Sequence, residues 1–409
     1  MDFWSLLQSL GGEEGPKSGL GSENRFEDIN LVQALGVLLI FVNTSFANSA
    51  GIGGGPITVC ILMYLFDVDS TKAIALSQIS IFGGSIIATA IKTTFKHPIK
   101  RKHSLIDYKL ITLVIPILMI SSSTGSLLTR LVQDWIVLTL LSIIAWIICI
   151  LTIIKGIKVF KEENKQLIGY HRLTVEAQTD ESEPETQLVY YFILIFSVIV
   201  MVIFNLFKGD TFFESVIGVE MCGSVYIGLF VSYHILVIIQ TVLYGAYLSN
   251  DLEKQGSFYT EIYGTKVNMA KLAVFSYATG LLSGALGMGG GLIMNPIFLL
   301  IGLNPDVSTA SCNAIVLATS IASSLCYTLA GYLGLFDGLG IMGLSMLGSI
   351  TGIFLIKSQV EKYKRMSIIV FILASMLTLV GILVPLKLVN IIYKSIQDGS
   401  FSYGLKHIC

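Results

Sequence analysis

Residues 49–55 read SAGIGGG and residues 285–291 read ALGMGGG, so the chain carries two copies of one glycine-rich pattern. Each copy ends in three consecutive glycines, at 53–55 and at 289–291. Glycines that serve close packing between membrane helices recur at four-residue intervals. A glycine in a helix interior costs roughly 1 kcal/mol. Three consecutive glycines therefore predict a helix break in both copies.

The apolar segment after each glycine cluster is short. It covers residues 56–66 in the first copy and residues 292–301 in the second. At about 1.5 Å per residue, neither can cross a hydrocarbon layer about 30 Å thick. Both are therefore expected to be half-helices that begin within the membrane. Pro56 suits the first turn of such a helix, because the N–H that proline lacks would be unpaired there.

A half-helix that begins in mid-membrane can bind an anion. Its first N–H groups are unpaired, and the positive end of its dipole points at whatever lies in front of it. Such an end attracts an anion without any charged side chain. Two inverted copies would face one another at a shared midplane site. The alternative is that both clusters are tight packing turns with no ligand.

The composition is that of a membrane protein. Hydrophobic residues make up 54% of the chain and charged residues 13%, with a mean hydropathy of +0.78. Apolar runs of about 20 residues recur between short charged segments, as in helices that cross a bilayer. The predicted fold class is an all-α polytopic membrane protein, with membrane lipid as a partner.

A net charge of −1 argues against nucleic acid as a partner. The six cysteines lack metal-binding spacing, so no cofactor is expected.

The two copies divide the chain into two repeats, each a glycine-broken helix pair followed by about three transmembrane helices. The predicted parts are a polar N-terminal segment (1–28), a first transmembrane repeat (29–157), a cytoplasmic linker (158–187), connecting transmembrane helices (188–248), a loop (249–266), a second transmembrane repeat (267–388) and a C-terminal tail (389–409).

The basic residues predict the orientation. Residues 96–103 read KHPIKRKH, and lysine and arginine in short loops favour the cytoplasmic side. Counting crossings from this loop places the 158–187 linker inside and starts the two repeats from opposite faces, so inverted repeats are expected.

Residues 1–30 carry no organelle address. The plasma membrane is the default location, with an organelle membrane as the alternative, and a homo-oligomer is left open.

Polar residues within the apolar segments complete the candidate site, because each must be satisfied inside the bundle or by a ligand. Ser77 and Gln78 in the first copy stand opposite Cys312 and Asn313 in the second. Interhelical hydrogen bonds are the alternative role for all of them. The predicted substrate-binding residues are Gly53, Gly54, Gly55, Ser77, Gln78, Gly289, Gly290, Gly291, Asn295 and Asn313.

Three further residues in or near the apolar segments are ionisable. His234 lies in the middle of an apolar segment and is either a proton relay or a neutral histidine bonded to a neighbouring helix. Lys92 and Lys271 lie near segment ends, where a long side chain is expected to reach the membrane interface.

Several of these motifs resemble one known family. The stretch from Leu31 to Val384 is similar to the TauE/SafE sulfite exporter family, and its basic loop is similar to that of eukaryotic members. The resemblance implies export or exchange of sulfite, organosulfonates or related small anions near the glycine breaks. Cys60 departs from the pattern, since the family often has a second proline there. The motifs are GIGGGP (51–56), AIALS (73–77), KHP (96–98), LIDY (105–108), GMGGG (287–291) and Pro296.

The predicted function is a secondary transporter of a small anion that works by alternating access, and not an enzyme. A membrane hydrolase would need a zinc HExxH helix, a Gly-x-Gly-Asp aspartyl pair or a serine site. The first two are absent, and Gly83-Gly84-Ser85 with His234 only imitates the third. The other alternative is a non-transporting scaffold or sensor on the same fold.

Overall fold

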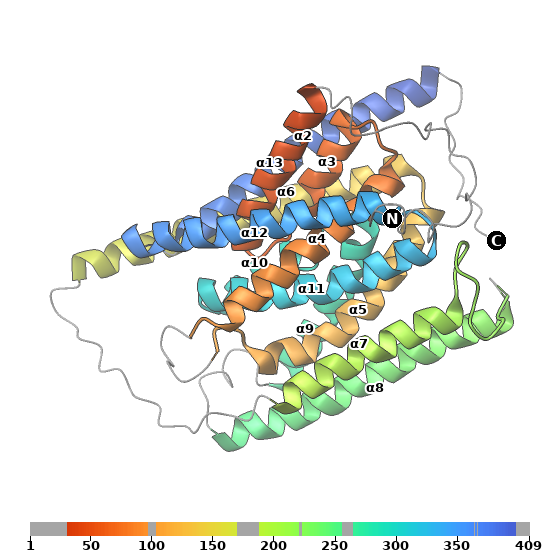
Figure 1. Ribbon diagram of the computed structural model, residues 1–409. Coiled ribbons are helices and arrows are strands. Elements are labelled where there is room, and N and C mark those ends of the chain that lie inside the picture. Colours follow the sequence, from red (N-terminus) through yellow and green to blue (C-terminus); the bar gives the residue numbers. More distant parts are fainter. Residues whose placement is uncertain are drawn as a thin grey trace, which may run out of the picture.

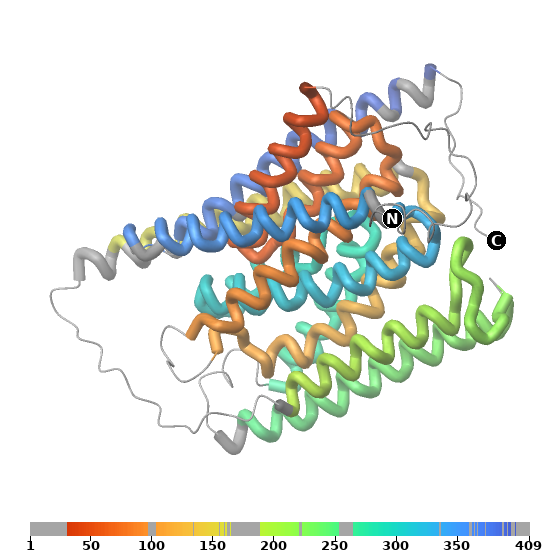
Figure 2. Tube along the Cα trace, viewed as in Figure 1, coloured from red at the N-terminus to blue at the C-terminus, as the bar shows by residue number. Residues whose placement is uncertain are grey.

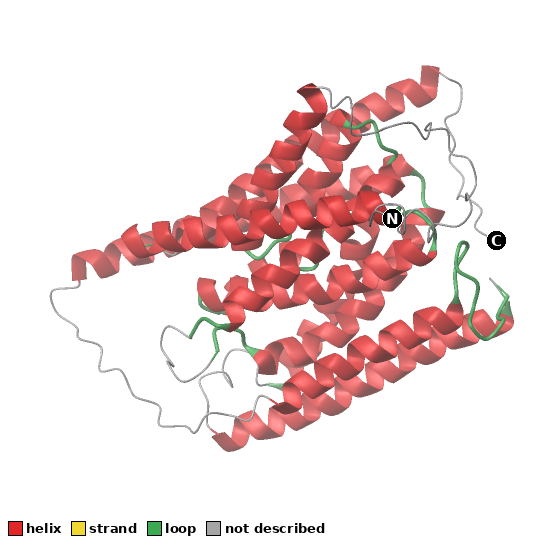
Figure 3. Cartoon of the chain, viewed as in Figure 1, coloured by secondary structure: helices red, strands yellow, loops and turns green. Residues whose placement is uncertain are grey.

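The computed structural model describes residues 31–96, 104–169, 188–220, 223–255, 265–363, 365 and 367–397. Within these ranges the chain consists of helices joined by loops, without a strand (Figure 3). Ten of the helices are long and apolar enough to cross a membrane. The all-α polytopic architecture is thus confirmed. The polar segment 1–28, most of the basic loop 96–103 and residues 170–187 of the linker lie outside the described residues.

The order of helices follows the two repeats (Figure 1). The first repeat contains α2 (Leu31–Ser49), α3 (Gly55–Leu65), α4 (Ser70–Thr93), α5 (Tyr108–Leu131) and α6 (Asp134–Gly169). The connecting helices are α7 (Leu188–Lys208) and α8 (Ser224–Gln255). The second repeat contains α9 (Lys266–Leu286), α10 (Gly291–Ile301), α11 (Pro305–Leu329), α12 (Leu335–Tyr363) and α13 (Ser367–Gln397).

The helices break where the glycines predict. The short helices α3 and α10 have 11 residues each, half the length of a spanning helix. Gly54 precedes α3 with φ +78°, and Gly287 ends α9 with φ +68°. Residues with a side chain rarely adopt this left-handed conformation, because their Cβ would approach the next carbonyl oxygen. Each glycine cluster thus ends one helix and begins a half-helix.

Three helices run further than the apolar pattern indicates. α6 ends at Gly169, α8 at Gln255 and α13 at Gln397. They enter segments that the sequence analysis assigns to the linker, the loop and the tail. The extension of α6 is rich in Lys, Glu and Gln, which favour helix intrinsically, so this helix can continue beyond the apolar span that crosses the membrane.

The two repeats interleave through reciprocal pairs of helices. α5 of the first repeat lies along α9 of the second. The corresponding helices of the opposite repeats, α12 and α2, also lie along each other. In the same way α4 lies along α12, and α11 lies along α5. The helices α4 and α11, which occupy the same position in the two repeats, also contact each other. Figure 2 shows the early and late parts of the chain mixed in one bundle. The main neighbours of the long helices of each repeat therefore belong to the other repeat, whereas α3 and α10 lie mainly against α4 and α11 of their own repeat.

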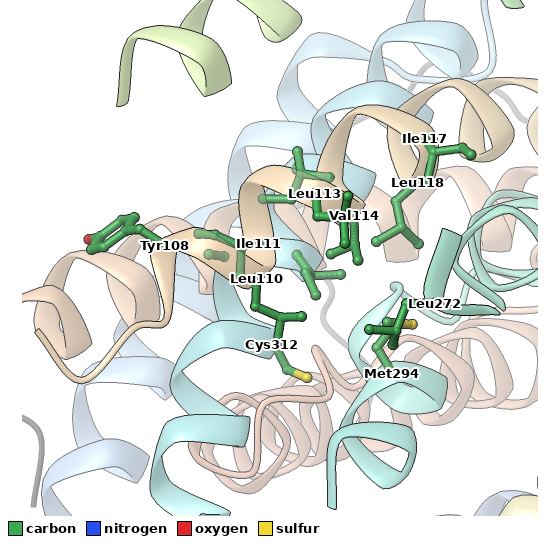
Figure 4. Close-up of a cluster of buried hydrophobic side chains, with 14 of the residues drawn as sticks. Tyr108, Leu110, Ile111, Leu113, Val114, Ile117, Leu118, Leu272, Met294 and Cys312 are labelled. Carbon is green, nitrogen blue, oxygen red and sulfur yellow. The ribbon is translucent and has the colours of Figure 1, made fainter. Parts of the chain in front are cut away.

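The buried core is centred on α5. Leu110 and Leu118 are fully buried, and Figure 4 shows the side chains of α5 in one cluster with Leu272 of α9, Met294 of α10 and Cys312 of α11. These side chains come from both repeats, so burial of the cluster joins the repeats.

The connecting helices α7 and α8 form a pair at the edge of the bundle, beside α5 (Figure 1). Their outward side chains are large and apolar. Phe192 of α7 is 70% exposed and Leu243 of α8 is 67% exposed. A surface of this kind suits hydrocarbon rather than water, so these two helices present the protein to lipid.

Candidate functional site

The two glycine breaks touch each other backbone to backbone. A Cβ placed on Gly55 would overlap the carbonyl oxygen of Gly287. A Cβ placed on Gly291 would overlap the carbonyl oxygen of Gly51, which is the corresponding position in the other copy. Only glycine permits this approach. The six predicted site glycines therefore lie together where the two repeats meet.

The N-termini of both half-helices are free of acidic residues. In α3 the helical hydrogen bonds begin with the N–H of Thr58, which donates to the carbonyl of Gly54 at 3.2 Å. In α10 they include that of Met294, which donates to the carbonyl of Gly290 at 3.1 Å. Neither first turn contains Asp or Glu. The N–H of Gly290, at the start of α10, donates to the neutral hydroxyl of Thr319 in α11 at 3.1 Å. The positive ends of both dipoles are therefore not neutralised locally.

The side-chain amides of the candidate site cross from one repeat to the other. Gln78 Nε2 in α4 donates to the carbonyl of Ser283 in α9 at 2.9 Å. Asn313 Nδ2 in α11 donates to the carbonyl of Asn48 in α2 at 3.0 Å. Both side chains are fully buried. The two bonds are reciprocal. Each joins the long helix that follows one half-helix, α4 or α11, to the helix that precedes the other glycine break, α9 or α2.

Ser77 and Asn295 follow the same rule. The Ser77 hydroxyl donates to the carbonyl of Ile74 in its own helix at 2.8 Å and lies 3.5 Å from the carbonyl oxygen of Gly287. Asn295 Nδ2 in α10 donates to the carbonyl of Ala50 at 2.6 Å. All four predicted polar residues thus lie at the breaks, and the three amides among them donate to carbonyls at the ends of α2 and α9. This conformation shows the interhelical bonds that the sequence leaves as the alternative role.

Some acceptors around the breaks have no partner. Gln78 Oε1, Asn313 Oδ1 and Asn48 Oδ1 are buried without a hydrogen-bond donor in reach. Leaving a buried acceptor unpaired costs roughly 1–3 kcal/mol. These oxygens can accept an O–H or N–H group of a ligand, in addition to the anion attraction of the half-helix ends.

Two apolar residues close the centre of the site. A Cβ on Gly53 would lie 2.9 Å from side-chain atoms of both Ile81 in α4 and Val316 in α11. These residues occupy corresponding positions in the two repeats, three residues after Gln78 and Asn313. Sequence reasoning missed them because an apolar residue in an apolar helix gives no signal of its own.

Lys92 corrects an expectation from the sequence. It is 5% exposed rather than extended to the interface. Its Nζ donates to the carbonyl of Ser49 at 3.0 Å and to that of Asn48 at 3.5 Å. The unpaired carbonyls at a helix C-terminus attract a cation, and α2 ends here, inside the bundle. Lys271 is exposed, as expected.

His234 is held away from the glycine breaks by two contacts. Its Nε2 lies 3.2 Å from the hydroxyl of Thr124 in α5, and its Nδ1 lies 2.9 Å from the carbonyl of Phe230 in its own helix. The Ser85 hydroxyl donates to the carbonyl of Phe82 at 3.0 Å. Ser85 and His234 thus bond other groups, and the hydrolase constellation they imitate in sequence is not assembled.

A buried ion pair joins the last turn of α5 to the loop after α7. Arg130 binds both carboxylate oxygens of Asp210, with N–O distances of 2.6 and 2.7 Å, and the side chains are 4% and 1% exposed. Burial raises the pKa of Asp210, but the hydrogen bonds and charge of Arg130 outweigh burial and hold the pKa below its usual value. The loop after α7 is also tied to α11, because the N–H groups of Phe212 and Phe213 donate to the carbonyl of Leu329.

The sequence profile of the family described as "Sulfite exporter TauE/SafE" matches residues 95–379. The chain belongs to this family. The matched region contains the second glycine break and seven whole long helices, α5 to α9, α11 and α12. As a TauE/SafE protein with ten apolar spans, the chain is a multi-pass integral membrane protein of a transporter family.

Similar TauE/SafE proteins occur in Arabidopsis thaliana. "Sulfite exporter TauE/SafE family protein 1" is 26% identical over 385 residues, which cover 87% of this chain and 84% of that protein. "Sulfite exporter TauE/SafE family protein 3" is 26% identical over 419 residues, covering 93% and 84%. No solved structure matches the chain. The match to protein 3 covers 93% of this chain, so it includes both glycine breaks.

Proposed function

We propose that this protein is a secondary transporter that exports or exchanges a small anion, such as sulfite or an organosulfonate, by alternating access around the two glycine breaks. The observation that carries the proposal is the pair of half-helices that begin where the two glycine breaks pack against each other. Two positive dipole ends without acidic neighbours favour an anion. The names of these relatives, which refer to sulfite export, agree with this chemistry.

The proposal includes an inverted relation between the repeats. α4 and α12 run in the same direction, since Ser80 lies 2.6 Å from Ser345, and a Cβ on Gly84 would lie 2.8 Å from Ser349. Contacts that advance together along both helices are typical of parallel neighbours.

α5 and α11 also run in the same direction. The N–H of Asp107 donates to Ser311 at 3.0 Å, and further along Ser122 lies 2.6 Å from Ser323. Successive spans such as α4 and α5 cross a membrane in opposite directions. The counterparts α4 and α11 then also cross in opposite directions, which supports inversion and a shared midplane site.

The proposed cycle exchanges protein contacts for anion contacts. In the present conformation the donors of Gln78 and Asn313 engage carbonyls of the opposite repeat. Rocking of one repeat against the other would separate these partners and open the space beside one half-helix. An anion would then accept hydrogen bonds from the helix N–H groups and from the released amides. Closing from the opposite face would restore the reciprocal bonds.

The test is uptake of radiolabelled sulfite, sulfate and taurine into liposomes that contain the purified protein. Gly54→Leu and Gly290→Leu place side chains at the two half-helix ends, whereas Gly340→Leu is a matched control, because a Cβ there meets no atom within 4 Å. We expect saturable uptake of one anion by the intact chain and the control, and its loss in both break variants.

Size-exclusion profiles must show that the variants still fold. No uptake by the intact chain under any pH or anion gradient would favour the non-transporting scaffold or sensor. The close backbone packing of the breaks is compatible with that second function, because it joins the repeats without any ligand.

A further inference from the structure

Lys92 and Tyr327 occupy corresponding positions in the two repeats. Lys92 lies 14 residues after Gln78 in α4, and Tyr327 lies 14 residues after Asn313 in α11. Both side chains are buried, at 5% and 0% exposed. One copy of the repeat therefore has an amine where the other has a phenol.

Their hydrogen bonds correspond as well. Lys92 Nζ donates to the carbonyls of Ser49 and Asn48, at the end of α2. The Tyr327 hydroxyl donates to the carbonyl of Gly284, at the end of α9, at 3.1 Å. Asn48 and Gly284 each precede the first glycine of their cluster by three residues. Each side chain thus caps the helix that leads into a glycine break.

The two positions differ in charge. Within the described residues, no carboxylate oxygen lies within 4.0 Å of Lys92 Nζ, and Asp306 at the start of α11 acts on it only at longer range. Arg130 is the cation that acts on Tyr327, and Asp210 neutralises it through two hydrogen bonds. The surroundings of the first break therefore keep a positive charge without a paired carboxylate, and those of the second do not.

A buried ammonium held only by carbonyl groups is costly to maintain, because carbonyl dipoles replace hydration only in part. The cost falls when an anion comes within reach. The ammonium is also close to the site, because Asn313 donates to the same Asn48 carbonyl as Lys92.

From this pairing we infer that Lys92 is an anion-binding residue of the proposed site, and that it receives the anion from the face where residues 94–107 join α4 to α5. The inference rests on the proposed transport function and adds its direction. The basic loop predicts that this face is cytoplasmic, so the charged position lies inside and the neutral Tyr327 position lies outside. An anion captured at Lys92 and released on the opposite face moves outward.

Binding of radiolabelled sulfite to the purified protein tests the inference. Lys92→Gln removes the charge and keeps a hydrogen-bond donor, and Lys92→Met removes both. Lys92→Arg keeps both, and Tyr327→Phe removes the corresponding neutral contact. We expect Lys92→Gln and Lys92→Met to raise the Kd by about tenfold or more, as when a charge-assisted hydrogen bond is lost, with Lys92→Arg and Tyr327→Phe within about threefold of the intact chain.

The control separates binding from structure. Lys92→Met and Tyr327→Phe each remove a cap from a helix end, so a purely structural role would lower Tm in both and leave the Kd unchanged in both. An unchanged Kd in Lys92→Gln overturns the inference. A Kd raised equally in Lys92→Arg also overturns it, because the charge would not be responsible.

The outcomes also separate this inference from the transport function. Sulfite binding that depends on Lys92, in protein that transports nothing, would contradict transport and support the binding role. Transport by Lys92→Gln with an unchanged KM would leave the transport function standing and overturn the role of Lys92. An intact chain that binds none of sulfite, sulfate and taurine would overturn both.

Discussion

The side-chain amide of Gln78 donates to the main-chain carbonyl of Ser283 at 2.9 Å, across the contact between the two repeats. Asn313 makes the reciprocal bond to Asn48 at 3.0 Å. Both bonds end at the last turn of the helix that leads into a glycine break. They therefore fix the position of each break relative to the opposite repeat.

Replacement of either amide by an apolar side chain of similar size should weaken this contact. Gln78→Leu and Asn313→Leu each lose one buried hydrogen bond, so we expect each to lower the free energy of unfolding by about 1 kcal/mol. Thermal unfolding in detergent measures the effect as a lower Tm. Ser232→Ala, at an exposed position of α8, serves as the control and should leave Tm nearly unchanged. A loss in only one of the two amide variants would contradict the reciprocal role.

The glycines at the breaks should not tolerate even one methyl group. In Gly55→Ala and Gly291→Ala the new Cβ would overlap a carbonyl oxygen of the opposite repeat, and overpacking of this kind costs about 1–3 kcal/mol or more. Gly340→Ala is the matched control in an exposed part of α12, where it should raise stability by up to about 1 kcal/mol. Yield of folded protein and Tm give the comparison. Equal stability of all three variants would show that the breaks can separate without penalty.

The ion pair of Arg130 and Asp210 should respond differently to single and double substitution. Asp210→Asn leaves a buried guanidinium without its counter-charge, at a cost of about 3–5 kcal/mol. The double variant Arg130→Met with Asp210→Leu removes both charges, and it should recover much of that loss. Denaturation of the two variants beside the intact chain measures the difference. Equal destabilisation in both would mean that packing, and not charge, determines the effect.

The same pair predicts how stability depends on pH. The folded-state pKa of Asp210 lies below its ordinary value of 3.8, so the unfolded chain binds a proton at a higher pH than the folded protein. The contribution of the carboxylate is complete above the unfolded pKa and is lost as the pH falls through the folded pKa. We expect Tm to decrease as the pH falls below about 4. Asp210→Asn should remove that part of the decrease, and an identical acid profile in the variant would exclude Asp210 as its source.

The candidate site could be predicted in part because its glycines act locally. Consecutive glycines at 53–55 and 289–291 break a helix whatever surrounds them, and an apolar run of 11 residues cannot span a bilayer in any fold. The positions of Ser77, Gln78, Asn295 and Asn313 near these breaks follow from the repeat. The buried role of Lys92 does not, because a lysine near a segment end looks the same whether it reaches the interface or turns inward.

The sequence by itself determined the spans, the two repeats, the breaks and the half-helices, because hydropathy, helix propensity and glycine conformation depend on neighbouring residues. Only the tertiary structure decided which groups meet across the repeats. Gln78 and Ser283 are 205 residues apart, Lys92 and Ser49 belong to different helices, and Arg130 and Asp210 are 80 residues apart. Local patterns report whether a polar group needs a partner, whereas the packing of the whole bundle selects the partner.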